Sequence, residues 1–86
     1  MSDVMSLEGP VLKRDGQLLL LIPLDAGGED FVECSRGISE LEDGFLKIVI
    51  PEWLAGMLRV DEGDLVVISN ANGKFGIWAA VPRLVH

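Results

Sequence analysis

The stretch FLKIVIPEWLAGMLRVDEGDLVVI, residues 45–68, decides the predicted fold. It opens on FLKIVI, a run of apolar and β-branched residues that predicts a strand. Pro51 follows, and its fixed φ suits the first turn of a helix, where no N–H is needed for an intrahelical hydrogen bond. Glu52 then favours the positive end of the helix dipole. We therefore predict a strand that passes directly into a short helix, at about residues 51–59.

The predicted helix carries an apolar stripe. Trp53 and Met57 are four residues apart, and so are Leu54 and Leu58, which is the spacing of one helix face. Gly56 weakens the helix by about 1 kcal/mol relative to alanine. So short a helix therefore has to be held in place by packing against other elements.

Strand and turn patterns continue after the helix. VDEGD is predicted to form a tight turn, with Gly63 as its left-handed residue, and it leads into the strand LVVIS. Asn72-Gly73 separates this strand from KFGIWAAV, and Asn-Gly between two apolar runs is a strong hairpin signal. The C-terminal half of the chain is thus predicted to be strand, helix and hairpin.

Two further strands are predicted before residue 45. QLLLLIPL, residues 17–24, is a continuous apolar run and predicts a strand buried on both faces. FVECS, residues 31–35, alternates in polarity, so we predict a half-exposed strand that forms a hairpin with the first one. SRGISELEDG, residues 35–44, is predicted to be a polar connection.

A turn-plus-strand unit recurs along the chain. Asp15-Gly16 precedes QLLLLIP, and Asp43-Gly44 precedes FLKIVIP at the same spacing, with an offset of 28 residues between the two units. Asn72-Gly73 then opens a third strand. Either an old duplication produced this regularity, or the turns simply precede strands, as such turns commonly do.

These patterns together predict a small, mainly β domain with hairpins and one short helix. Gly9-Pro10 punctuates the start of the chain. We predict a flexible N-terminal lead-in over residues 1–12, a single β-rich domain over residues 13–82 and a short C-terminal tail over residues 83–86.

Composition predicts a soluble dimer. The chain has 86 residues, enough for one domain, and 49% of them are hydrophobic. So small a domain buries little of this apolar surface by itself, which favours a second copy as the partner. The net charge is −7, with seven Lys and Arg residues. Because nucleic-acid affinity comes mostly from phosphate neutralisation by such residues, the acidic balance argues against generic polyanion binding.

The cysteine count and the N-terminus predict a cytoplasmic protein without a membrane partner. Cys34 is the only cysteine, so no intrachain disulfide can form. The opening residues carry an acid, and no apolar signal-peptide region follows them. The longest apolar run, residues 18–24, is too short to cross a bilayer.

Residues 44–78 resemble the swapped-hairpin domain of the AbrB/MazE family. The matching features are a strand that ends in Ile-Pro, a short helix with spaced leucines, a Gly-Asp turn, a strand and a hairpin. They are Ile50-Pro51, Leu54, Leu58, Val60, Gly63-Asp64, Val66, Ile68 and Gly73. The resemblance implies that two chains interleave their hairpins to close one barrel. The N-terminal segment, residues 17–35, is longer than the usual first strand of the family.

The family resemblance implies two kinds of function. Some members bind DNA through basic residues on the hairpin and around the helix, whereas others are antitoxins that bind a toxin through appended tails. PEWLAGML has no Arg or Lys where DNA-binding members commonly carry them. The candidate nucleic-acid contacts are therefore Lys47, Arg59 and Lys74.

The sequence offers little for catalysis, and we predict no catalytic residue, no metal site and no cofactor. His86 is the only histidine and ends the chain, so no histidine lies near Cys34 to activate it. Asp61, Glu62 and Asp64 lack the longer ligand series of a calcium loop and are expected to be turn acids. Gly27-Gly28 lacks the strand-turn-helix context of a phosphate-binding loop.

The two tryptophans have two possible roles. They could form part of the barrel or dimer core, the preferred assignment, or they could mark a partner surface, because tryptophan is common at interaction hot spots. The predicted dimer or barrel core consists of Ile48, Ile50, Trp53, Leu54, Leu58, Val66, Ile68, Ile77 and Trp78.

Three functions remain open. We favour a non-enzymatic homodimeric protein-interaction module, antitoxin-like or structural. The alternative is a DNA-binding transcriptional regulator that uses the same dimeric fold. An enzyme with a site assembled across the dimer is the third.

Overall fold

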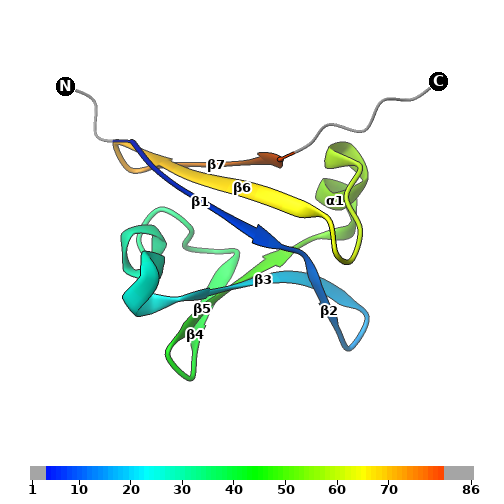
Figure 1. Cartoon of the computed structure of the whole chain (residues 1–86), viewed down its shortest axis with the longest axis horizontal. Helices are drawn as coiled ribbons and strands as arrows, with labels where there is room; N and C mark the ends of the chain where they lie inside the picture. The colour runs from blue at the N-terminus through cyan, green and yellow to red at the C-terminus, as the bar shows by residue number, and fades with distance from the viewer. Residues whose placement is uncertain (1–3, 81–86) are drawn as a thin grey trace.

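The computed structural model describes residues 4–80, which form a mainly β structure with two antiparallel sheets, one above the other (Figure 1). One short α-helix and two 3-10 turns lie at opposite ends of the sheets. The elements are β1 (Val4–Pro10), β2 (Leu12–Arg14), β3 (Gln17–Pro23), η1 (Leu24–Ala26), η2 (Gly28–Phe31), β4 (Ser39–Glu42), β5 (Phe45–Ile50), α1 (Glu52–Leu58), β6 (Leu65–Ala71) and β7 (Lys74–Ala79).

The two sheets stay separate within one chain. One has the strand order β1-β6-β7 and the other has the order β2-β3-β5-β4. The chain passes from the first to the second at Val11, whose N–H donates to the Asp64 carbonyl at 2.8 Å. The predicted mainly β class and single α-helix are confirmed. The predicted barrel is not closed in one chain, because β4 and β7 end their sheets without a further paired strand in the described residues.

The core lies between the two sheets. Alternate residues of β3, β5 and β6 point into it, so these strands bury one face. Its buried members are Val11, Leu20, Ile22, Phe31, Leu46, Ile48, Ile50, Ala55, Val60, Val66 and Ile68. Leu54, Leu58 and Ile77 are partly buried against this cluster. Most of the predicted core residues therefore pack together, whereas the two tryptophans do not.

Residues 4–10 form a strand, so this part of the predicted loose lead-in over residues 1–12 is wrong. β1 pairs with β6 along its whole length, from Val4 opposite Ala71 to Pro10 opposite Leu65. Leu7 packs against the core. The antiparallel ladder satisfies backbone groups that a loose segment would leave to water. Residues 1–3 and the predicted tail, 83–86, lie outside the described residues.

The prediction of a strand over residues 31–35 is wrong. This segment ends η2 and continues as turns. Phe31 and Ser35 are both buried, and the Ser35 hydroxyl donates to the Phe31 carbonyl at 2.7 Å. Buried residues four apart belong to a turn of helix, whereas a strand would bury residues two apart. β3 pairs instead with β2 on one side and β5 on the other.

Three hairpins share one turn geometry. In Asp15-Gly16, Asp43-Gly44 and Asn72-Gly73 both residues have positive φ, between 46° and 88°. This is the pattern of the type I′ turn, whose twist matches that of the flanking strands. The predicted Asn72-Gly73 hairpin is confirmed as β6 and β7. The segment predicted as a polar connection contains β4, because the Asp43-Gly44 turn folds it against β5.

The four-stranded sheet has an internal two-fold relation. Leu20 pairs with Ile48, and these residues are themselves 28 positions apart. Adding 28 to the β2–β3 pair Leu12 and Leu19 gives the β4–β5 pair Glu40 and Lys47. The register therefore follows the sequence offset, which supports the duplication over a chance recurrence of turns.

Candidate interaction site

Helix α1 is built to cover one end of the core. Pro51 is extended, with φ −61° and ψ 154°, and the Ala55 N–H donates to the Pro51 carbonyl at 2.9 Å. Ala55 is buried in the core, and Leu54 and Leu58 pack against it. This inner face holds a helix that would not form alone at this length. The sequence prediction of a short helix after Pro51 is confirmed.

The outer face of α1 exposes two large apolar side chains. Trp53 is 67% exposed and Met57 is 74% exposed. Gly56 is next to Met57, and a Cβ at Gly56 would have no neighbour within 4 Å. Trp53 and Met57 therefore form an exposed apolar surface within one chain, and the space at the neighbouring Gly56 is also open among the described residues. We call this surface the Trp53–Met57 face. The predicted stripe is in fact two faces, because Leu54 and Leu58 point inward.

A groove of about 740 Å³ runs beside α1, between the helix, the Asp15-Gly16 turn region and the paired ends of β3 and β5. Its volume falls in the range of ligand-binding clefts. Its apolar lining includes Leu18, Ile50, Ala55 and Val60, and its charged lining consists of Lys13, Glu52, Arg59 and Asp61. The sequence did not predict this groove, because Lys13 and α1 meet only in the folded chain.

Arg59 ends the helix in an unusual backbone conformation. Its φ is 57° and its ψ is 47°, the left-handed region that side chains other than glycine seldom adopt. The following Val60 N–H donates to the Ala55 carbonyl at 3.1 Å and closes the helix end. Arg59 therefore lines the groove at a position where glycine would fit with less strain.

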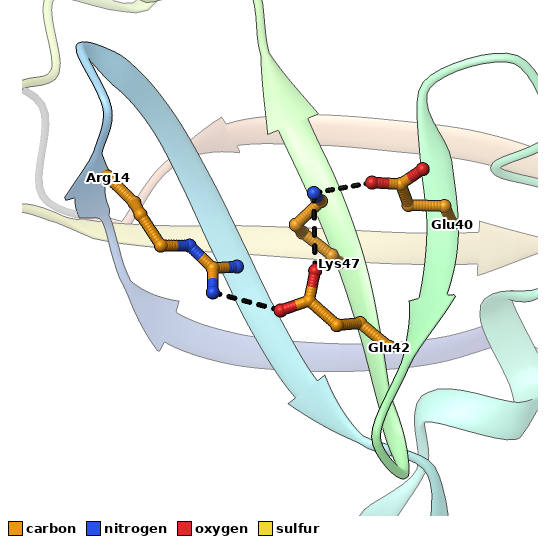
Figure 2. A network of polar contacts seen from close by, with 4 residues as sticks. All are labelled: Arg14, Glu40, Glu42 and Lys47. Carbon is orange, nitrogen blue, oxygen red and sulfur yellow. Dashed lines mark ion pairs between the residues drawn. The ribbon is translucent and has the colours of Figure 1, made fainter.

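An ion-pair network lies across the outer face of the four-stranded sheet (Figure 2). Arg14 Nη1 is 2.9 Å from Glu42 Oε1, although β2 and β4 are the two outer strands of this sheet. Lys47 Nζ pairs with Glu40 Oε1 and, at 3.3 Å, with Glu42 Oε2. The long side chains thus reach over β3 and β5, and the network joins the two related halves of the sheet.

The network fixes the charge state of its members. Hydrogen bonds from Arg14 and then Lys47 lower the pKa of the Glu42 carboxyl. The hydrogen bond to Glu40, followed by that to Glu42, raises the pKa of Lys47. Both shifts favour the ionised pairs. The Lys47 side chain is only 15% exposed, and its ammonium group pairs with the carboxylates of Glu40 and Glu42. It is therefore less accessible to a partner molecule than an exposed lysine.

The structure does not bring the predicted nucleic-acid contacts together in one chain. Lys47 lies on the outer face of the four-stranded sheet within the ion-pair network. Arg59 follows α1, and Lys74 begins β7 after the Asn72-Gly73 turn. Figure 1 places α1 and this turn at opposite ends of the three-stranded sheet. One chain therefore offers no continuous basic surface from these three residues.

The two tryptophans are exposed within one chain. Trp78 is 46% exposed on β7, and Trp53 lies on the Trp53–Met57 face. The other predicted core residues are buried or partly buried, with Val66 and Ile68 among the most buried. A core role for the tryptophans thus requires a second chain and stays a prediction.

The residues weighed for catalysis have structural roles. Burial raises the pKa of the Cys34 thiol, which donates to the Phe31 carbonyl at 3.6 Å. The Asp61 N–H donates to Asp64 Oδ2, and the Glu62 N–H donates to Asp61 Oδ1, both at 2.8 Å, so these acids shape the turn before β6. No group of three metal-ligating side chains occurs within residues 4–80. His86 lies outside the described residues.

No helix in the described part of the chain combines the length and the apolar character that a membrane span needs. Comparisons with known proteins find no family model, no curated protein and no solved structure that matches the chain. The AbrB/MazE-like interpretation of residues 44–78 therefore stays a prediction. What the molecule does has to be inferred from its own surface.

Proposed function

We propose that this protein is a non-enzymatic, homodimeric protein-interaction module, antitoxin-like or structural, and that the Trp53–Met57 face recognises its protein partner. The main support for this proposal is that Trp53 and Met57 are both exposed, one helical turn apart on α1. Tryptophan is strongly enriched among residues that dominate binding energy. An exposed pair of this size on a packed helix is costly in water unless a partner covers it.

The charges around α1 indicate the chemistry of the partner. Glu52 begins the helix, and Asp61 and Glu62 follow it, all exposed, with Arg59 and, from the groove lining, Lys13 as the nearby cations. The chain as a whole carries a charge of −7. Complementarity favours a partner segment with an apolar anchor flanked by basic residues. The groove beside α1 gives such a segment room to extend past the helix.

The DNA-binding alternative has less support. Its three candidate cations lie apart, and Lys47 is held by Glu40 and Glu42. The AbrB/MazE resemblance is compatible with both functions. The arrangement of charge within the chain favours a protein partner over a phosphate backbone.

Trp53→Ala tests this proposal. We expect the free energy of unfolding to change by less than about 0.5 kcal/mol, because the side chain is largely exposed in one chain. Capture of the partner from the native host should fall at least tenfold, since hot-spot truncation costs about 2 kcal/mol or more. The measurements are a thermal melt and quantitative co-purification.

Leu41→Ala is the matched control, because Leu41 is 62% exposed and belongs to β4, which Figure 1 places away from α1. It should leave both stability and capture unchanged. A Trp53→Ala protein that unfolds would assign Trp53 to the folding core. Unchanged capture by a folded Trp53→Ala protein would remove the Trp53–Met57 face as the recognition surface.

A further inference from the structure

Strand β7 has one unpaired edge. It is the last strand of the order β1-β6-β7, and no strand within residues 4–80 pairs on its far side. Lys74 pairs with Ala71 beside the two-residue turn, and the Ala80 N–H donates to the Leu65 carbonyl at 3.0 Å. Because bonding alternates along an antiparallel strand, the even-numbered residues bond to β6. The N–H and C=O groups of Phe75, Ile77 and Ala79 therefore point away from the sheet.

The other sheet edges are protected against pairing, whereas β7 is not. β1 carries Glu8 and ends in Pro10, which has no N–H. β2 has only three residues, and β4 carries two glutamates. β7 runs for six residues with no proline and no acid, and its one charge is Lys74 at the start. Apart from Lys74 at its start, β7 lacks the devices with which natural proteins block free edges, so the rest of this edge is suited to a partner strand.

We propose that a second copy of this chain pairs with β7 through its own β7, antiparallel, about a two-fold axis at Ile77. The result is a continuous six-stranded sheet made of two three-stranded sheets. This inference rests on the proposed homodimer and names where the two chains join. In this register Ile77 lies opposite the partner's Ile77, and Phe75 lies opposite the partner's Ala79. Every outward N–H and C=O of the three residues then bonds, which gives roughly six backbone hydrogen bonds.

The side chains in this register fit by size. Phe75 lies opposite the partner's Ala79, and Trp78 lies opposite the partner's Gly76. A Cβ at Gly76 would lie 2.7 Å from Ser69 Oγ and 3.4 Å from the ring of its own Trp78, so this position does not admit a larger side chain. An aromatic ring over a cross-strand glycine is a favourable pair in sheets. Trp78, 46% exposed in one chain, is covered in the pair.

The charges also favour this edge for a second copy. Two chains of −7 repel over most of their surfaces, but β7 has no acid. In the proposed register Lys74 lies opposite the partner's Ala80, and the two lysines lie at opposite ends of the shared ladder. Moving the axis two residues to Phe75 would leave Ala79 without a partner. The seam therefore carries no acid and only the two lysines at its ends, whereas the molecule as a whole is acidic.

Amide hydrogen exchange of the wild-type protein tests the seam directly. With increasing protein concentration, we expect the amides of Phe75, Ile77 and Ala79 to exchange at least tenfold more slowly. The amides of Gly76 and Trp78 are the internal controls, because they bond to β6 in one chain and should not respond. Sedimentation equilibrium on the same samples gives the oligomeric state.

The outcomes separate this inference from the proposed function. A dimer whose Phe75, Ile77 and Ala79 amides stay fast contradicts the β7 seam and leaves a homodimer of another kind, such as interleaved hairpins. A monomer at all concentrations contradicts both the seam and the homodimer. Slow exchange at the three positions that appears only with dimerisation supports both.

A pair of proline variants adds a second test. Ala79→Pro removes an outward N–H, a position where edge strands tolerate proline, and should raise the dissociation constant at least tenfold with the monomer still folded. Ala80→Pro, one residue on, removes the N–H that bonds to Leu65 and should lower the melting temperature without blocking the seam. A folded Ala79→Pro protein that dimerises as wild type would overturn the proposal. If Ala79→Pro does not fold, the exchange pattern of the wild-type protein decides.

Discussion

Arg59 combines backbone strain with a place beside the candidate site. Its left-handed conformation, φ 57° and ψ 47°, closes α1. Helices commonly end with glycine in this conformation, because a Cβ there costs energy. Strain held at a surface position is a reason to look for function there, and Arg59 lines the groove beside the Trp53–Met57 face.

Arg59→Gly should stabilise the protein by about 1 kcal/mol, since it removes the cost of a Cβ in the left-handed region. Chemical denaturation measures this free energy of unfolding. Arg59→Ala is the control, because it removes the charge and keeps the Cβ, and it should change stability little. A less stable Arg59→Gly protein would mean that the arginine side chain makes stabilising contacts that outweigh the backbone strain.

The burial of Trp53 cannot be deduced from its sequence neighbours. Trp53 and Leu54 are neighbours with similar apolar character. Leu54 packs on the core and Trp53 is 67% exposed. Helical periodicity places them about 100° apart on the helix, but only the position of the sheet decides which of them turns inward.

At the scale of elements, the ion-pair network connects the outer strands of the four-stranded sheet. Arg14 and Glu42 occupy related positions, 28 residues apart, and pair with each other across the sheet (Figure 2). Leu12 and Leu19 in one half correspond to Glu40 and Lys47 in the other. The two halves thus differ at these positions. The apolar pair of one half corresponds to a charged pair in the other, and Arg14 corresponds to the oppositely charged Glu42.

The network makes stability depend on pH in a defined direction. The pKa of Glu42 is lowered from its ordinary value of 4.5, so its contribution is present above that value and is lost as pH falls through the lowered pKa. The stability difference between wild type and Glu42→Gln should therefore be constant near neutral pH and vanish in acid. Urea unfolding from pH 7 to about pH 3 checks this.

Glu33→Gln is the control for this prediction, because Glu33 pairs with Arg36 on an exposed turn outside the network. Its difference from wild type should stay small throughout, as for most exposed pairs. A Glu42→Gln protein whose difference from wild type persists unchanged in acid would show that the carboxylate acts through something other than its charge. At the basic end, the raised pKa of Lys47 preserves its pairs until pH rises past the ordinary lysine value of 10.5.

At the scale of the whole molecule, net charge argues against generic DNA binding. Each chain carries 14 acids and seven Lys and Arg residues. One of the candidate phosphate contacts, Lys47, is occupied by two carboxylates. Arg59 and Lys74 lie at different ends of the three-stranded sheet. A duplex would therefore meet repulsion over most of the surface.

We expect no micromolar binding of random duplex DNA at ~50 mM salt, where electrostatic affinity is near its strongest. Titration of a labelled duplex tests this. The Arg59→Glu and Lys74→Glu variants should behave as wild type. Micromolar binding that either variant abolishes would contradict this prediction and place the DNA-binding regulator first.

Local chemistry was sufficient for much of the fold. Asp-Gly and Asn-Gly require positive φ at both turn residues, so the three type I′ hairpins follow from adjacent residues. Pro51 can start a helix because a backbone N–H at this position has no intrahelical acceptor, so its absence in proline costs no hydrogen bond. The alternation of Met5 and Leu7 with Ser6 and Glu8 is compatible with a strand, but the Gly9-Pro10 pair that follows favours the prediction of a loose lead-in.

The candidate site could not be predicted in the same way, because its parts are far apart in the chain. Lys13 and Arg59 line one groove although 46 positions separate them, and Phe31 is buried as part of a turn only because the two sheets meet around it. The sequence alone determined turns, strands and the helix start, since each depends on a few neighbouring residues. Only the tertiary structure decided that Trp53 faces solvent, that Lys47 is paired and that β7 has a free edge, because burial, ion pairing and strand order depend on how distant segments pack.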